Sequence, residues 1–185
     1  MNMVAAPAID RVRQSAPARV SYGPGDSAAG ARVRLYEANG LVLSAQGMIF
    51  APGVSFNGPV EPRRAGSLEL RGLAGYGFAL ASKPAFASAE AGYRFFARGQ
   101  PGAWRVDFAF GVRPFERVMI LAQSFISLQT QSAKNFPRSL WQKAQLSLVY
   151  EFAPGWSAQI GGFMTVWGAN TGRELGPLVA VWRRF

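Results

Sequence analysis

From residue 30 onward, apolar and polar side chains alternate with a period of two, and this pattern constrains the fold more than any other feature. In residues 103–113, tryptophan, valine and phenylalanine occupy even positions, whereas arginine and aspartate occupy odd ones. Residues 67–81 and 139–152 show the same alternation. Successive side chains of a strand point to opposite faces, whereas a helix repeats every 3.6 residues. The sequence therefore predicts strands with one apolar and one polar face.

The links between the predicted strands alternate between short and long. The short links include Asn39-Gly40, whose residue types accept the positive φ angles of a type I′ hairpin turn. An outer-membrane β-barrel has tight turns on one rim and larger loops on the other. The rhythm therefore predicts an antiparallel up-and-down sheet of barrel type. Nine strands are expected, near residues 30–37, 41–51, 67–81, 85–97, 103–113, 117–130, 139–152, 156–167 and 176–185.

The predicted fold class is all-β: an antiparallel up-and-down transmembrane β-barrel, incomplete, with about nine strands in residues 30–185. No apolar run reaches the 18 residues of a transmembrane helix. Residues 1–29 lack the basic segment and apolar core of an export signal. We expect them to be poorly ordered or partly sheet-like, with residues 18–22 as a remnant strand. Because bacterial single-chain barrels have even strand numbers, we expect at least one strand to be missing before the first, through an N-terminal truncation or a misassigned start.

The net charge of +10 would suit either nucleic acid or an anionic membrane surface. The arginines stand singly inside apolar segments, and the alternation places most large aromatic side chains on the opposite face. A sheet that binds RNA needs both kinds of side chain on one face, because bases stack on the rings. The sequence therefore favours membrane lipid as a partner and argues against nucleic acid.

The chain has no histidine and no cysteine. This composition removes the usual general base, the common nucleophile systems and the common zinc sites. An outer-membrane hydrolase or acyltransferase, which typically relies on histidine, is disfavoured for the same reason. We therefore expect no enzyme activity, no catalytic residue, no metal and no cofactor.

In a closed barrel the polar face would line the lumen. Isolated charges in a narrow interior are costly, so arginine–carboxylate pairs are expected there, and the planar fork of arginine suits them. In a soluble two-sheet sandwich the same face would be the solvated side, an alternative that the sequence leaves open. The predicted lumen-lining residues are Arg32, Arg34, Glu69, Arg71, Glu90, Arg94, Arg105, Asp107, Arg113, Lys143 and Glu151.

Aromatic residues near the ends of the predicted strands suggest the interfacial girdles of a membrane barrel, since amphipathic rings prefer the two interfaces. Ordinary sheet packing is the alternative. The candidates near the short turns are Tyr36, Phe86, Phe115, Tyr150, Phe152 and Trp156, and those near the long loops are Phe50, Phe95, Phe96, Trp104, Trp141 and Trp167.

Several short segments, taken in order, resemble the bacterial XagA family. They are residues 30–37, 39–47, 73–78, 91–94, 123–125 and 182–185, and the similarity covers about residues 28–185. The resemblance implies an outer-membrane barrel encoded with exopolysaccharide or biofilm glycosyltransferase genes. It implies a role in polymer export or surface attachment, with no catalytic residues. The family also has N-terminal strands and a signal that this sequence lacks. A channel for small polar or anionic solutes is the alternative, because the same architecture serves both.

Overall fold

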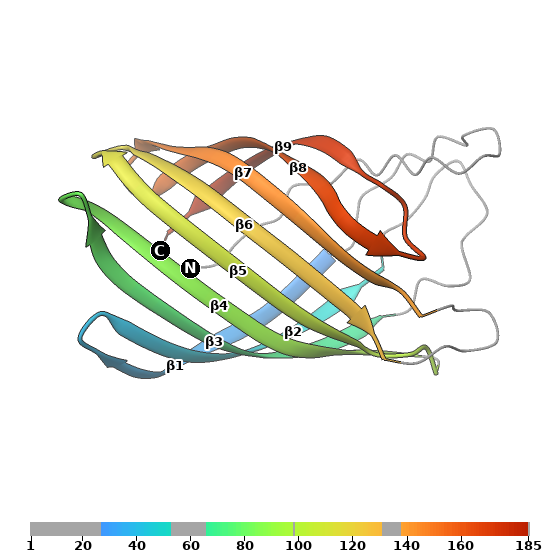
Figure 1. Ribbon diagram of the computed structural model, residues 1–185. Helices are drawn as coiled ribbons and strands as arrows, with labels where there is room; N and C mark the ends of the chain where they lie inside the picture. Colours follow the sequence, from blue (N-terminus) through green and yellow to red (C-terminus); the bar gives the residue numbers. More distant parts are fainter. Residues whose placement is uncertain (1–26, 53–65, 98, 131–137, 185) are drawn as a thin grey trace.

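The computed structural model describes residues 27–52, 66–97, 99–130 and 138–184, and these residues form one nine-stranded sheet. Each strand pairs antiparallel with the next along the chain (Figure 1). The described part of the chain holds no helix with the length and apolar character needed to cross a membrane. The strands are β1 (Ser27–Ala38), β2 (Leu41–Ala51), β3 (Ser67–Leu80), β4 (Lys83–Phe96), β5 (Ala103–Phe115), β6 (Val118–Gln129), β7 (Leu140–Ala153), β8 (Trp156–Ala169) and β9 (Leu175–Arg183).

The predicted meander is confirmed, and the strand boundaries differ from the expected ones by at most three residues. The largest difference is at β1, which begins at Ser27 because Ser27 and its neighbours pair with the end of β2 at Ala51. Residues 27–29, expected in the N-terminal segment, therefore belong to the sheet. The predicted remnant strand at residues 18–22 lies outside the described residues.

Two-residue turns lie at one end of the sheet. They join β1 to β2, β3 to β4, β5 to β6 and β7 to β8, at residues 39–40, 81–82, 116–117 and 154–155. Asn39 and Gly40 have φ angles of 50° and 82°, as the expected type I′ turn requires. Ala81 and Ser82 also have positive φ angles, although neither residue type favours them. The longer links all lie at the opposite end, which we call the long-loop end.

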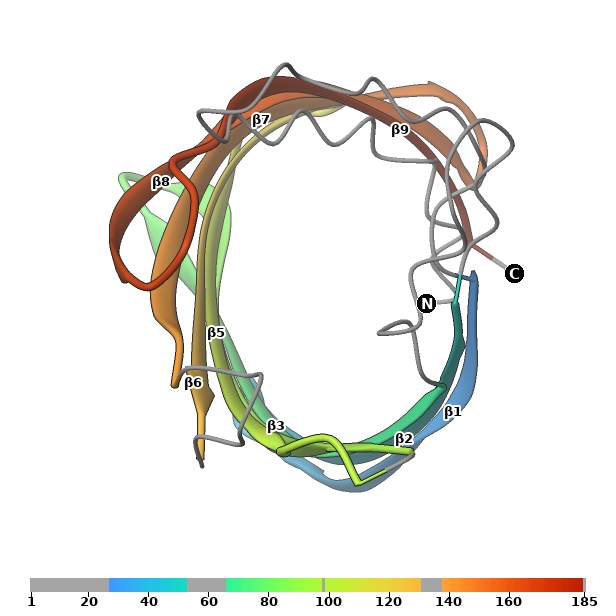
Figure 2. The ribbon, with the colours of Figure 1, turned by 90° about the vertical axis from the view of Figure 1, so that its right-hand side faces the viewer.

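The sheet curls around a common axis (Figure 2). An ion pair across several strands demonstrates the curvature: Arg32 Nη2 on β1 lies 3.6 Å from Glu90 Oε1 on β4. Adjacent strands are about 4.8 Å apart, so in a flat sheet these two strands would be separated by roughly 14 Å. The side chains meet because both point into the concave face.

The sheet does not close into a barrel. Among the described residues, β1 pairs only with β2 and β9 only with β8, and the two edge strands flank the opening in Figure 2. The expected lumen is therefore a concave face, open along one side. Because strands alternate in direction and both edge strands have odd numbers, β1 and β9 run in the same direction.

A small apolar core lies on the concave face toward the two-residue turns. Met119 and Leu121 of β6 and Val149 of β7 are buried there, packed against Phe86 of β4 and Trp182 of β9. Gly111, the partner of Phe86 in β5, makes room for this ring, since a Cβ at Gly111 would lie 2.2 Å from a ring carbon. The core therefore joins side chains of β4, β6, β7 and β9 along the concave face.

Candidate functional site

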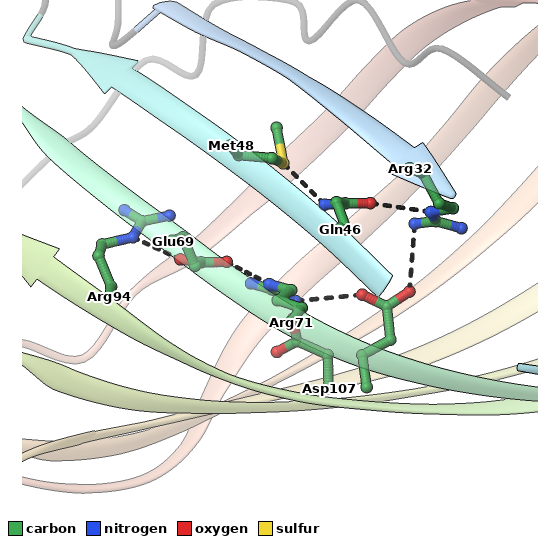
Figure 3. A network of polar contacts seen from close by, with 8 residues as sticks. Arg32, Gln46, Met48, Glu69, Arg71, Arg94 and Asp107 are labelled. Carbon is green, nitrogen blue, oxygen red and sulfur yellow. Dashed lines mark hydrogen bonds and ion pairs between the residues drawn. The ribbon is translucent and has the colours of Figure 1, made fainter. Parts of the chain in front are cut away.

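The concave face carries an ion-pair network centred on Glu69 of β3, whose side chain is 0% exposed (Figure 3). Arg94 stands opposite Glu69 in the register of β4 and donates from Nε to Glu69 Oε2 over 2.5 Å. Arg71, two residues further along β3, donates to the other oxygen of the same carboxylate. Both oxygens of Glu69 thus accept from arginine, so the cost of burying this charge is offset by two charge-assisted bonds.

Arg71 also joins two carboxylates of neighbouring strands. Glu90 of β4 and Asp107 of β5 are directly opposite each other, a position where like charges repel. Arg71 Nη1 lies 3.2 Å from Glu90 Oε2 and also pairs with Asp107. A single guanidinium therefore neutralises a pair of acidic side chains that the register would otherwise force together.

The network extends to the open edge of the sheet through Arg32 of β1. Arg32 pairs with Glu90, and its Nε donates to Gln46 Oε1 of β2 over 2.8 Å (Figure 3). Each of the three carboxylates in the network, Glu69, Glu90 and Asp107, thus has at least one arginine partner. The expected arginine–carboxylate pairing is confirmed for these residues.

The opposite wall, formed by β6 to β9, carries amides in its middle, between Lys143 and Glu151 of β7. Gln145 donates to Gln123 Oε1 over 2.8 Å, and Gln159 donates to Ser147 Oγ over 2.8 Å. The indole of Trp182 donates to Gln159 Oε1 over 3.0 Å. The sequence pattern placed the glutamines and serine on the polar face but did not identify Trp182, which stands opposite Ser157 in the register of β8 and β9. Trp182 occupies an even position in β9, and this parity could have placed it on the concave face.

All eleven predicted lumen-lining residues lie on this one face in the observed register. Six of them meet in the network described above, whereas the others stand apart. Arg34 pairs with exposed Glu37, Arg113 lies 3.9 Å from Glu151, and Lys143 Nζ lies 2.6 Å from Glu174 Oε2. The alternation of polar and apolar residues gave no signal for Glu174, because Glu174 follows β8 in a link rather than in a strand.

Arg105 is the remaining predicted residue, and its guanidinium packs against an aromatic ring. Its central carbon lies 5.0 Å from the ring centroid of Trp141 on β7. Its Nε is buried and has no hydrogen-bond partner among the described residues. Arg105 forms no ion pair with the carboxylates that the structure places.

The prediction of interfacial aromatics is partly wrong. Phe50, Phe86, Phe96 and Trp141 occupy strand positions that point to the concave face. Their parity, not their closeness to a strand end, decides their direction. Arg94 lies 3.7 Å over the ring of Phe50, so the expected separation of arginines from aromatic rings is also incomplete. The exposed aromatics on the convex face are Tyr36, Tyr76, Phe95, Trp104, Phe108, Phe110, Phe115, Tyr150, Phe152, Trp156 and Trp167.

The described residues contain no group of three or more acidic, histidine or cysteine side chains placed to hold a metal ion. The chemistry that the concave face offers is recognition by charged and amide groups. Comparisons with protein-family models, curated proteins and solved structures found no match.

Proposed function

We propose that this chain forms most of an outer-membrane β-barrel of the XagA type, which serves exopolysaccharide export or surface attachment in a biofilm. The observation that carries this proposal is the convex face. Each of the nine strands presents at least one large, exposed apolar side chain there, including Leu146 at 62%, Ile160 at 64% and Val179 at 64% exposure. Soluble monomers rarely expose an apolar surface of this extent, whereas a membrane barrel needs one.

The concave side supports the same assignment. Most charged residues of the strands point inward, where ion pairs hold the Glu69 network together and amide hydrogen bonds add to it, whereas Lys83 and Arg183, at strand ends, lie on the convex side. A soluble sheet buries its apolar face and exposes its polar face to water. In this chain the apolar face is the exposed one. All strands of the described residues belong to one sheet, so the described chain provides no second layer to cover the convex face.

The proposal requires closure of the sheet, because lipid offers no hydrogen bonds to the free edges of β1 and β9. These edges run in the same direction, so antiparallel closure takes an odd number of additional strands. The inner face of β1 supports this requirement: Arg32 and Arg34 have side chains that are 46% and 64% exposed, unlike the covered charges of β3. We therefore propose that the complete barrel has an even number of strands.

The proposal leaves two roles, export and attachment. The side chains that crowd the concave face favour attachment. Small barrels have interiors filled by side chains. Here the ion pairs reach from β1 to β5, and the apolar core reaches from β4 to β9. In a narrow closed barrel these side chains would crowd the axis that an exported polysaccharide would follow, whereas a chain held at the rim would not meet them.

A complementation experiment tests this function. Bacteria that lack the protein are compared with bacteria that carry it, and surface-retained and released exopolysaccharide are measured separately. Loss of retained polymer with normal release is expected. An unchanged distribution of polymer would contradict the attachment role.

Membrane insertion is tested separately on the full chain. We expect detergent-dependent solubility and a gel mobility that changes on heating, as for other outer-membrane barrels. A monodisperse protein purified without detergent would overturn the assignment.

A channel for small polar or anionic solutes is the second candidate, favoured by the charged groups on the concave face. Conductance across planar bilayers separates the two functions. A steady conductance blocked by a small anion would favour the channel, whereas the attachment role predicts little conductance.

A further inference from the structure

The concave face has more cations than carboxylates around the Glu69 network. Four arginines lie there, Arg32, Arg71, Arg94 and Arg105, against three carboxylates. The first three arginines use all three carboxylates. Arg105 is thus the one arginine of these four that has no carboxylate partner in the described part of the chain.

The surroundings of Arg105 make this surplus costly. Its Nε is buried without a hydrogen-bond partner in the described part of the chain. The face of Trp141 stabilises the guanidinium, but a ring supplies no acceptor in the plane of the N–H groups. Ser127, its partner in the register of β6, is 5% exposed. A guanidinium whose buried Nε–H donor has no acceptor is destabilised until an oxyanion reaches it.

Arg105 is half-buried and lies close to the long-loop end of the sheet. It is the third residue of β5, next to the link that joins β4 and β5 at the long-loop end. Larger loops are extracellular in outer-membrane barrels. The nearby cation Lys143 is already paired with Glu174. Among the arginine and lysine side chains that the strands place on the concave face at this end, Arg105 is therefore the one that an incoming anion would meet unpaired, because Arg94 and Lys143 are paired.

We propose that Arg105 binds a carboxylate group of an acidic polysaccharide at the long-loop end, an inference that rests on the proposed attachment function. The planar guanidinium offers two parallel N–H groups to a carboxylate, which gives a strong charge-assisted contact. One bound carboxylate would bring the local set to four cations and four anions. The substrate class is a polymer of uronic acid units rather than a neutral glycan.

The test uses the full chain reconstituted in phosphatidylcholine vesicles and titrated by calorimetry. The probes are an oligogalacturonate, its fully methyl-esterified form of equal length, and free galacturonate. The variants are Arg105→Gln, which removes the charge, and Arg105→Lys, which keeps the charge but not the fork. Arg117→Gln is the matched control, because it removes a positive charge from a two-residue turn at the opposite end.

We expect the acidic oligomer to bind at least tenfold more tightly than its ester and than free galacturonate. Loss of a charged contact typically weakens binding by about tenfold or more, so Arg105→Gln should lose this factor. Arg105→Lys should fall between, and Arg117→Gln should bind as the parent does. Binding of the oligomer should also weaken as salt is added.

Three results would overturn the inference. Equal binding of the acid and the ester would show that no carboxylate is recognised. Equal affinity for free galacturonate would indicate a general anion site instead of a polymer site. If Arg105→Gln and Arg105→Lys leave binding unchanged but lower the stability of the folded protein, Arg105 is paired with another carboxylate of the chain. None of these results touches membrane insertion, which heat-dependent mobility reports independently.

Discussion

The substitution Leu146→Arg separates a lipid-facing surface from a water-facing one. Leu146 is the seventh of 14 residues in β7 and is 62% exposed on the convex face. At about 3.3 Å per residue, such a strand spans roughly 45 Å. At the tilt of about 45° usual in membrane barrels it covers roughly 30 Å, the thickness of the hydrocarbon core. Leu146 therefore lies near the mid-plane of the bilayer in our account.

An arginine at the mid-plane of a barrel's lipid face costs about 2–4 kcal/mol. A substitution on a water-facing surface usually changes stability by less than about 0.5 kcal/mol. With a urea dependence of about 2 kcal/mol per molar, Leu146→Arg should lower the unfolding midpoint by about 1–2 M. Tryptophan fluorescence of protein folded into phosphatidylcholine vesicles gives this midpoint.

Phe115→Arg is the matched control, because Phe115 is 71% exposed but lies at the end of β5, beside a two-residue turn. Near the interface the same change costs only about 0–1 kcal/mol. Equal, small shifts for the two variants would refute the reasoning, and so would a Leu146→Arg protein that stays soluble without detergent.

Three other substitutions test the packing. Glu69→Gln leaves two largely covered arginines without their shared carboxylate and should lower the free energy of unfolding by about 3 kcal/mol. Glu37→Gln is the control, because it breaks an exposed pair and should change the urea midpoint little. Similar midpoints for the two variants would argue against a buried network. Gly161→Ala places a Cβ 2.3 Å from a backbone oxygen of β7, whereas the nearest atom to a Cβ at Gly162 is 3.5 Å away. The first alanine should therefore reduce the yield of folded, heat-modifiable protein far more than the second, and equal yields would contradict the observed packing. Ser82→Gly relieves a φ of +63° and should stabilise the fold by about 0.5–1 kcal/mol, which a lower midpoint would contradict.

The period-two pattern predicts the strands, their order and the face that each charge occupies. A strand has only two faces, so parity alone assigns Arg105 and Asp107 to one side and Phe108 to the other. The turn at Asn39-Gly40 sets the register of the first hairpin as far as Tyr36, beyond which the pairing shifts by one residue at an irregularity between Arg34 and Tyr36. This part of the fold is local, and local sequence suffices for it.

Contacts between distant strands could not be predicted in the same way. The pairing of Arg32 with Glu90 depends on the curvature of the whole sheet, and the double role of Arg71 depends on the registers of β3, β4 and β5 together. The closeness of Trp141 to a strand end wrongly suggested an interfacial ring, whereas its odd position in β7 directs it inward. The open edge between β1 and β9 follows from the odd strand number that the sequence already indicated.

Spin labels along β7 test the central claim, that lipid covers the convex face. The chain has no cysteine, so each single substitution Ala144→Cys, Gln145→Cys, Leu146→Cys, Ser147→Cys and Leu148→Cys gives one labelling site. In vesicles, labels at the even positions should collide with oxygen dissolved in lipid and not with a water-soluble nickel complex, and labels at 145 and 147 should be protected from both. Even-position labels that collide with the nickel complex, or with neither reagent, would contradict the account.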